Sequence, residues 1–371
     1  MYSNRTQNTE CVNSQNPFGF HLSDGTVYTY LSGSEYEDIA AAWDWNLIPG
    51  ITVDYAATPL SCGQTQFAGI QGYVGGVTTN TVGIGAMRYT NPLTRALSWQ
   101  KAWFFLSDDV QHVMVNSIHT NETANASSSA PIFSVLDQRK HVSHIFVDDV
   151  PVSSGNFSGA HTLWHGDVGY AFPTGLQQRD VLCEDTPPVS LTVNVGERTG
   201  NWSSLGISTQ PPPTIDLFSA WLAHAPTSDS ASYTMFPAVT YPQFLWKSQQ
   251  TKIIEIRNDG NISAVVDPSH KTAMVVFWAE DGGSVTIPST IQGIAPVIVS
   301  SNRGLLVILE ETTWTLTVSD PSQIFLDAQV ELCLGQGRRP QGWGGGKTVI
   351  VPITLPSEGT AGSSVSVPLK F

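Results

Sequence analysis

WFFLSDDVQHVMVNSIHT, residues 103–120, contains the pattern that decides the fold class of this chain. Two apolar runs flank Ser107-Asp108-Asp109, and aspartate favours turns because its side chain hydrogen-bonds the nearby backbone. The stretch therefore predicts two antiparallel strands joined by a tight turn. Similar runs rich in Val, Ile and Thr are VYTYLSG (27–33), HIFVDDVPV (144–152), VSLTVNV (189–195), TKIIEIRNDG (251–260), TAMVVFWAEDGG (272–283), PVIVSSNRG (296–304), LLVILEETTWTLTVSD (305–320) and KTVIVPITLP (347–356). Short runs of this kind predict sheets that pack face to face.

Helix is predicted in only two short stretches. SEYEDIAAAWDWN (34–46) has Ser34 at a candidate N-cap and Glu37 at the capping-box position, and Pro49 would end the helix. TIDLFSAWLAHA (214–225) follows three prolines and is the second candidate. The sequence therefore predicts an all-β fold with few short helices.

A change in strand length suggests two units. After VDPSHKT (266–272) the predicted strands are shorter and turn residues are more frequent. We expect a large antiparallel β-sandwich over residues 1–270 and a smaller C-terminal β-sandwich over residues 271–371. The length of 371 residues is sufficient for two or three such units.

The composition narrows the class of partner. The chain has 31 acidic and 17 basic residues, a net charge of −14 and one Arg pair, Arg338-Arg339. No nucleic-acid partner is expected, because nucleic-acid binding requires a basic face. No membrane span is predicted, because no apolar run approaches 18 residues. Six glycosylation sequons and an even number of cysteines favour a secreted protein, with two disulfides in any of three pairings among Cys11, Cys62, Cys183 and Cys333.

Each local pattern that suggests a catalytic or binding site also has a simpler structural interpretation. QGWGGGKT (341–348) is similar to a phosphate loop, but Gln341 replaces the first glycine and a strand is predicted to follow, so we expect a turn. The histidine pairs within 141–144 and 161–165 lie on predicted strands and loops without a carboxylate-rich ligand set, so no metal site is predicted. No cofactor is predicted, and no Gly-x-Ser-x-Gly elbow is present. Loops rich in Trp, Asn and Gly are typical of surfaces that bind sugars, although tryptophan is more often buried in a core.

EYEDIAAAWDWNLIPGITVDY (35–55) resembles a motif of polysaccharide lyase family 8, the group of hyaluronate, chondroitin AC and xanthan lyases. The family pattern is Glu-Tyr, then Trp-x-Trp, then Ile-Pro-Gly-x-Thr. It is carried here by Glu35, Tyr36, Trp43, Trp45, Ile48, Pro49, Gly50 and Thr52. Further stretches that resemble the family in the same order are GFHLSDG (19–25), WFFLSDD (103–109), SVLDQRK (134–140), HGDVGYAFP (165–173), GNWSSLG (200–206) and VSDPSQ (318–323). The resemblance spans nearly the whole chain.

The resemblance implies a fold of three parts. These are an N-terminal α/α toroid of helices, a large antiparallel β-sandwich (supersandwich) and a smaller C-terminal β-sandwich. This chain resembles the second and third parts. Residues 1–17 are polar and lack the apolar region of a signal peptide, so Met1 is expected to be an internal residue of a longer, extracellular enzyme.

The resemblance also implies a reaction, β-elimination on a uronic-acid polysaccharide such as hyaluronan, chondroitin or a xanthan-like glucan. A neutral group beside the uronate carboxylate stabilises the charge that develops when C5 loses its proton. A base takes that proton, and an acid protonates the leaving glycosidic oxygen. In the family the Asn, His, Tyr and Arg that do this lie on the toroid. This chain is therefore expected to require the toroid as its partner and to be inactive alone.

One family element does fall within this sequence. Family members have a Glu-x-x-Asn in the first β segment, and Glu10 and Asn13 match its spacing. The resemblance implies that Glu10 orients the His and Arg of the toroid, and that Asn13 bonds the sugar. Arg5 and Asn8 are weaker candidates for substrate contact. The plainer interpretation is a polar turn at a frayed chain end.

A non-enzymatic alternative is a stand-alone carbohydrate-binding module. The aromatic and amide content and the absence of the toroid residues support it, while the net charge of −14 counts against binding to an acidic polysaccharide. Trp43 and Trp45 are expected to pack in the sandwich rather than to contact substrate.

Overall fold

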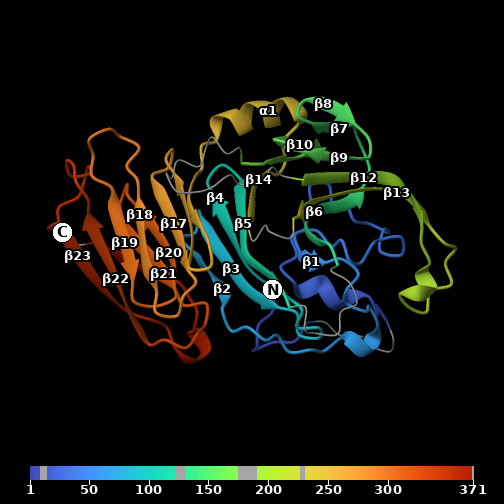
Figure 1. Ribbon diagram of the computed structural model, residues 1–371, viewed down its shortest axis with the longest axis horizontal. Coiled ribbons are helices and arrows are strands. Elements are labelled where there is room, and N and C mark those ends of the chain that lie inside the picture. The colour runs from blue at the N-terminus through green and yellow to red at the C-terminus, as the bar shows by residue number, and fades with distance from the viewer. Residues whose placement is uncertain (9–14, 122–129, 174–189, 226–229, 370–371) are drawn as a thin grey trace.

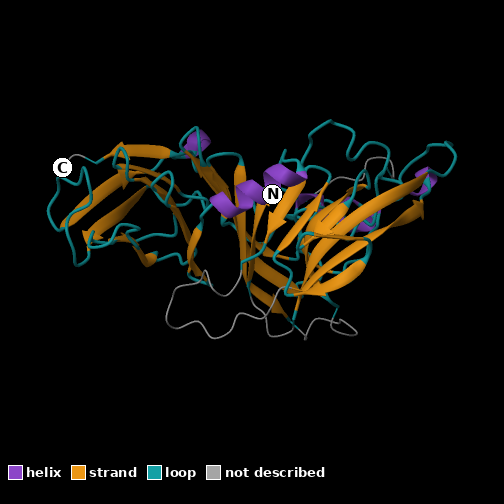
Figure 2. Cartoon of the chain, turned by 90° about the horizontal axis from the view of Figure 1, so that it is seen from above, coloured by secondary structure: helices purple, strands orange, loops and turns teal. Residues whose placement is uncertain are grey.

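The structure is a computed structural model that describes residues 1–8, 15–121, 130–173, 190–225 and 230–369. Four antiparallel sheets and, within these residues, one α-helix form the chain (Figures 1 and 2). The described residues also contain four short 3-10 helices: η2 (Gly19–Ser23), η3 (Cys62–Gln64), η4 (Trp202–Ser204) and η5 (Glu358–Thr360). The prediction of an all-β fold built from sandwiches is confirmed.

Two sheets form the first sandwich. The five-stranded sheet has the order β1 (Thr52–Asp54), β6 (Ile132–Lys140), β13 (Thr214–His224), β12 (Ser190–Thr199) and β9 (Gly155–Ser158). The nine-stranded sheet has the order β2 (Val74–Thr78), β3 (Gly83–Thr90), β4 (Leu97–Leu106), β5 (Val110–Thr120), β14 (Ala231–Phe236), β11 (Val168–Ala171), β10 (Thr162–His165), β7 (Ile145–Val147) and β8 (Val150–Val152). One core joins them, in which Trp99 and Val113 of the larger sheet share a cluster with Leu136 and Phe218 of the smaller.

Two further sheets form the second sandwich. The six-stranded sheet has the order β15 (Ile254–Asn258), β16 (Ile262–Asp267), β17 (Thr272–Phe277), β20 (Leu306–Glu310), β21 (Thr315–Ser319) and β24 (Val365–Pro368). The four-stranded sheet has the order β18 (Gly283–Ile287), β19 (Val297–Ser301), β22 (Asp327–Leu334) and β23 (Thr348–Thr354). Val275 and Leu316 of the former lie in one core with Val299 and Leu332 of the latter. The domain boundary predicted between residues 270 and 271 lies in the turn that joins β16 and β17, and it stays a prediction.

A third core joins the two sandwiches. Phe104 and Met114 of the nine-stranded sheet share a cluster with Met274 and Ile308 of the six-stranded sheet. β16 and β17 are buried at every position, because the six-stranded sheet has a sandwich core on each face. Continuous apolar runs such as TAMVVF suit a strand that is buried on both sides. The sheets therefore stack in the order five, nine, six and four strands, with the C-terminal sheets at the left of Figures 1 and 2.

The turns follow local chemistry. Asp108 and Asp109 have φ of 60° and 52° between β4 and β5, and Asp148 and Asp149 have φ of 48° and 65° between β7 and β8. Positive φ at successive turn residues matches the right-handed twist of a hairpin, and aspartate tolerates it. The turn predicted at Asp108-Asp109 is therefore confirmed, and Asp148-Asp149 forms a second turn of the same kind. QGWGGGKT (341–348) also forms the expected turn region, between the paired strands β22 and β23.

Both helix predictions are wrong. Residues 34–46 form successive turns, and residues 214–225 include β13, whose two neighbours β12 and β6 hydrogen-bond it along its length. The one α-helix, α1 (Tyr241–Gln250), was not predicted, although Thr240 and Gln243 form a capping box at its start. The strand predicted over residues 27–33 is also absent.

The structure gives the state of two cysteines and tests the described helices for a membrane span. Cys62 is disulfide-bonded and Cys333 is free, so two disulfides among the four cysteines are excluded. Within the described residues, no helix is long and apolar enough to cross a membrane.

Candidate functional site

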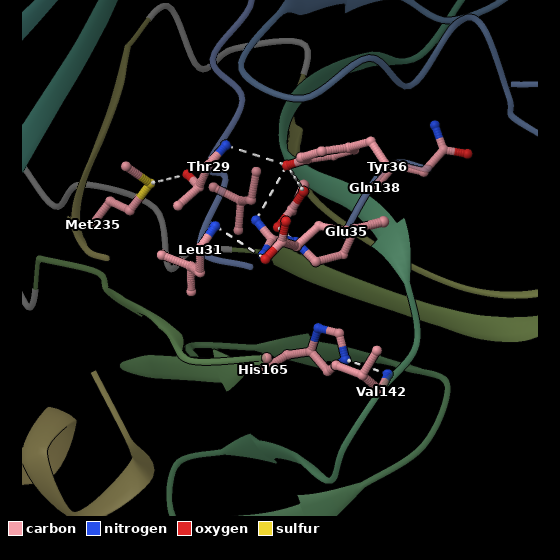
Figure 3. Close-up of polar contacts among 12 residues, drawn as sticks. Thr29, Leu31, Glu35, Tyr36, Gln138, Val142, His165 and Met235 are labelled. Carbon is pink, nitrogen blue, oxygen red and sulfur yellow. Dashed lines mark hydrogen bonds and ion pairs between the residues drawn. The ribbon is translucent and has the colours of Figure 1, made fainter. Parts of the chain in front are cut away.

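The turns of residues 34–46 are fixed first by Glu35. Its carboxylate accepts hydrogen bonds from the backbone N–H groups of Leu31, Ser32 and Gly33, at 3.0, 2.6 and 3.0 Å (Figure 3). Partial burial raises the pKa of Glu35, but these hydrogen bonds outweigh it and lower the pKa to about 2. A carboxylate that holds three successive N–H groups favours a closed loop. It therefore helps to explain why a helix does not begin here.

Tyr36 fastens the same segment to β6. Its hydroxyl donates to Asp137 Oδ1 at 3.1 Å and accepts from Arg139 Nη2 at 3.2 Å. Asp137 and Arg139 are both buried and form an ion pair at 2.5 Å. Burial raises the pKa of Asp137, and Arg139 opposes that shift. A buried network in which the charged partners face each other fixes the position of the segment on the sheet.

Gln138 positions the Trp-Asp-Trp motif from the neighbouring position of β6. Its Oε1 accepts from the backbone N–H of Asp44 at 2.9 Å, and its Nε2 donates to the carbonyls of Asp44 and Leu47, each at 2.9 Å. The indole N–H of Trp43 donates to the Gln138 carbonyl at 3.2 Å, and that of Trp45 donates to the Ala40 carbonyl at 3.0 Å. Both indole N–H groups are thus satisfied within the protein, so the two rings are held in place.

The motif lines a groove with a volume of about 540 Å³, which we call the Trp-Asp-Trp groove. It is lined by Phe18, Trp43, Asp44, Trp45, Asn46, Tyr55, Ala56, Thr58, Pro59, Leu60 and Arg198. The rings of Trp43 and Trp45 are 5.3 Å apart and nearly perpendicular, at 83°. Trp43 and Trp45 are half-buried, so each packs in the protein and also borders the groove.

The polar groups of the groove centre on Asp44. Its Oδ1 accepts from the backbone N–H and the Nδ2 of Asn46 at 3.0 and 3.2 Å, and its Oδ2 accepts from the Tyr55 hydroxyl at 2.8 Å. Burial, together with this bond to Asp44, raises the pKa of Tyr55 to about 12. Arg198 of β12 faces the same carboxylate at 3.7 Å, which is too long for a hydrogen bond. The groove therefore combines aromatic rings with one acid and one base.

The predicted site residues have different positions. Glu10 and Asn13 lie outside the described residues, so their role stays a prediction. Arg5 donates from its two terminal nitrogens to four backbone carbonyls, those of Gly72, Val74, Pro321 and Ser322, at 2.9 to 3.1 Å. Asn8 is buried and accepts from the Phe67 backbone N–H at 2.9 Å. Both side chains tie the N-terminal segment to the rest of the fold.

Two of the histidines, His141 and His165, lie side by side with their ring centroids 5.5 Å apart. His165 is buried and packs its ring on Phe218, with the ring centroids 4.0 Å apart, while His141 pairs with Asp216 at 2.7 Å. Burial lowers the pKa of His165 to about 3. Among the described residues, no group of three or more His, Cys, Asp or Glu side chains is placed to hold a metal ion.

Sequence reasoning missed three residues of this region. Gln138 lies in SVLDQRK, where the resemblance marked a segment but no role for the glutamine. Tyr55 ends the quoted stretch 35–55 but is not one of the residues that carry the family pattern, and Arg198 comes from a distant part of the chain that no local pattern connects to Trp45. Only the pairing of β12 with β13, and of β13 with β6, places Arg198 on the same sheet as the strand that holds the motif.

Known proteins match most of the chain. The sequence profile of the polysaccharide lyase family 8 super-sandwich domain matches residues 1–248, and that of the family 8 C-terminal beta-sandwich domain matches residues 256–324. Chondroitinase-AC of Pedobacter heparinus is 25% identical over 367 residues, which cover 90% of this chain and 48% of that protein. Xanthan lyase of a Bacillus species is 24% identical over 348 residues, which cover 87% of this chain and 34% of that protein.

Solved structures show the same fold. A chondroitinase AC lyase, solved as enzyme–oligosaccharide complexes, superposes with a TM-score of 0.80 at 22% identity, over 99% of this chain and 50% of that one. A Paenibacillus xanthan lyase superposes with a TM-score of 0.75 at 22% identity, over 90% of this chain and 31% of that one. The chain therefore spans about half or less of the length of these relatives.

Proposed function

Because the chain belongs to polysaccharide lyase family 8, we propose that it is the β portion of an extracellular enzyme that cleaves a uronic-acid polysaccharide by β-elimination. The observation that carries this proposal is the match to both β domains of the family in order. Relatives named for chondroitin, hyaluronate and xanthan support an acidic polysaccharide as the substrate class.

The proposed reaction divides the chemistry between two parts of the enzyme. A base removes the C5 proton of the uronate, the bond from C4 to the glycosidic oxygen breaks, and a C4–C5 double bond forms. An acid returns a proton to the leaving oxygen. The α/α toroid is proposed to supply these groups, together with the neutral partner of the uronate carboxylate. This chain alone is therefore proposed to be inactive.

The contribution of this chain to the active site is proposed to come from Glu10 and Asn13. A carboxylate at Glu10 would orient a histidine or arginine of the toroid, and the Asn13 amide would bond the sugar. Arg5 was proposed as a weaker substrate contact. Its four bonds to backbone carbonyls favour a structural role instead, because four of its five N–H donors already have partners.

The test uses Glu10→Gln and Asn13→Ala in the enzyme that joins this chain to its toroid. We expect each variant to lower kcat by roughly 100-fold, as loss of one orienting or stabilising group does in other active sites. Glu37→Gln is the matched control, since Glu37 is exposed and distant in sequence from the proposed pair. The rate is followed by the ultraviolet absorbance of the unsaturated uronate. Full activity of both variants would refute the site assignment.

A second candidate function is a stand-alone carbohydrate-binding module. The Trp-Asp-Trp groove is the observation that favours it, because aromatic rings and polar groups border one hollow. Calorimetric titration of the chain with hyaluronan, chondroitin and a xanthan-type glucan tests it. Binding without elimination when the toroid is present would favour the module over the lyase.

A further inference from the structure

We propose that the Trp-Asp-Trp groove is a binding subsite for a uronate residue of an acidic polysaccharide, with Arg198 as the partner of the uronate carboxylate. The subsite goes beyond the proposed contribution of Glu10 and Asn13, which belong to a different segment. The choice of a uronate as ligand rests on the proposed function. The groove itself does not, because its geometry stands on the described residues alone.

Arg198 is the first reason. Among the residues that the structure describes, it is the one basic residue that lines the groove, and its side chain is 45% exposed. Its guanidinium donates no hydrogen bond to any residue that the structure describes, and its contact with Asp44 is 3.7 Å long. In a chain with 31 acidic and 17 basic residues, an arginine with free N–H groups is suited to a carboxylate, which it binds with two parallel hydrogen bonds.

Asp44 competes only weakly with a ligand carboxylate for the Arg198 guanidinium. Its two carboxylate oxygens already accept three hydrogen bonds, from the backbone and side chain of Asn46 and from the Tyr55 hydroxyl. The Asp44 charge is therefore used to hold Asn46 and Tyr55 at the groove. A ligand carboxylate that approaches Arg198 from the solvent side meets a guanidinium that is only weakly paired.

The aromatic wall is the second reason. Trp43 and Trp45 stand nearly perpendicular, and Phe18 lies with its ring centroid 6.4 Å from that of Trp45. Each indole N–H is bonded to a backbone carbonyl, so the rings are held without help from a ligand. A fixed aromatic ring loses little conformational entropy when it stacks on the apolar face of a sugar.

The test is titration of the 371-residue chain with a hyaluronan tetrasaccharide, followed by calorimetry and by quenching of tryptophan fluorescence. The same tetrasaccharide with its uronates reduced to neutral sugars is the second ligand. We expect Arg198→Gln to weaken binding of the acidic ligand by roughly tenfold, the loss of one charge-assisted pair, and to leave the neutral ligand unchanged. Trp45→Phe is expected to weaken both ligands.

Arg339→Gln is the matched control, because Arg339 is exposed and lies between β22 and β23 of the second sandwich. Equal binding of the acidic ligand by Arg198→Gln and Arg339→Gln would overturn the proposal, as would no binding by the unaltered chain. Binding with the expected Arg198 dependence, but no eliminase activity in the enzyme that includes the toroid, would refute the proposed lyase and retain the subsite. An active lyase whose β portion does not bind would refute the subsite alone.

Discussion

Lys101 offers a quantitative test of the packing between the family motif and the nine-stranded sheet. The side chain lies in β4, is fully buried, and donates from Nζ to the Gly50 carbonyl at 2.8 Å. The ammonium lies 5.3 Å from the ring centroid of Trp99 and 5.8 Å from that of Trp103. Burial lowers the pKa of Lys101 from 10.5 to about 7, while Asp24 opposes the shift.

The magnitude follows from this pKa. Between pH 7 and 10.5 the unfolded chain binds more protons at this lysine than the folded chain, so the free energy of unfolding rises with pH. Keeping Lys101 in the folded protein costs about 4 kcal/mol at pH 7 and about 2 kcal/mol at pH 9. Lys101→Met removes this cost but leaves the Gly50 carbonyl without its donor, which costs about 1–3 kcal/mol. We therefore expect a net stabilisation at pH 7 that shrinks by about 2 kcal/mol by pH 9.

The assay is urea unfolding of the wild type and Lys101→Met at pH 7, 8 and 9. Lys347→Met, at an exposed lysine, is the control for the loss of one charge. Other groups that titrate in this range are common to all three proteins, so their contributions cancel in the difference. A difference between the wild type and Lys101→Met that stays constant across this pH range would refute the reasoning. The buried lysine would then have an ordinary pKa.

The remaining predictions concern other buried groups and one contact between segments. Burial raises the pKa of Asp54 to about 6, so its charged form destabilises the fold above pH 6. Urea unfolding should therefore show that Asp54→Asn raises the free energy of unfolding by about 3 kcal/mol above pH 6, and by less toward pH 4. Burial lowers the pKa of His165 to about 3, so the free energy of unfolding of the wild type should fall as the pH falls below 6.5. Because His165→Phe lacks this titration, its free energy of unfolding should rise by about 2 kcal/mol relative to that of the wild type between pH 7 and pH 5. A Cβ at Gly169 would lie 2.1 Å from Phe244, so Gly169→Ala should lower the unfolding free energy by about 1–3 kcal/mol, and an unchanged value would contradict this contact. Arg5→Gln should raise amide hydrogen exchange at Ser322 and Gln323 while leaving β22 unaffected, because the Arg5 guanidinium links the 321–323 loop to the N-terminal segment.

Features of the fold that depend on neighbouring residues could be predicted from the sequence. Runs of Val, Ile and Thr gave the strands of both sandwiches, since alternation over a few residues is sufficient to specify a half-buried strand. The aspartate pair at 108–109 predicted its turn, because aspartate tolerates positive φ. The Trp-x-Trp and Ile-Pro-Gly residues identified the family motif. Each of these depends on side-chain chemistry within a few positions.

Where the local preference of a segment is ambiguous, contacts with distant segments determine its secondary structure. Residues 214–225 have an apolar pattern that suits a helix, yet two strands hydrogen-bond this segment on either side and make it a strand. Residues 34–46 have good helix formers, yet Glu35, Tyr36 and Gln138 hold them as turns against β6. The Trp-Asp-Trp groove likewise combines Trp45 and Tyr55 with Arg198, which no sequence spacing connects to them. Contacts between distant segments depend on how whole sheets pack, and local sequence does not specify that packing.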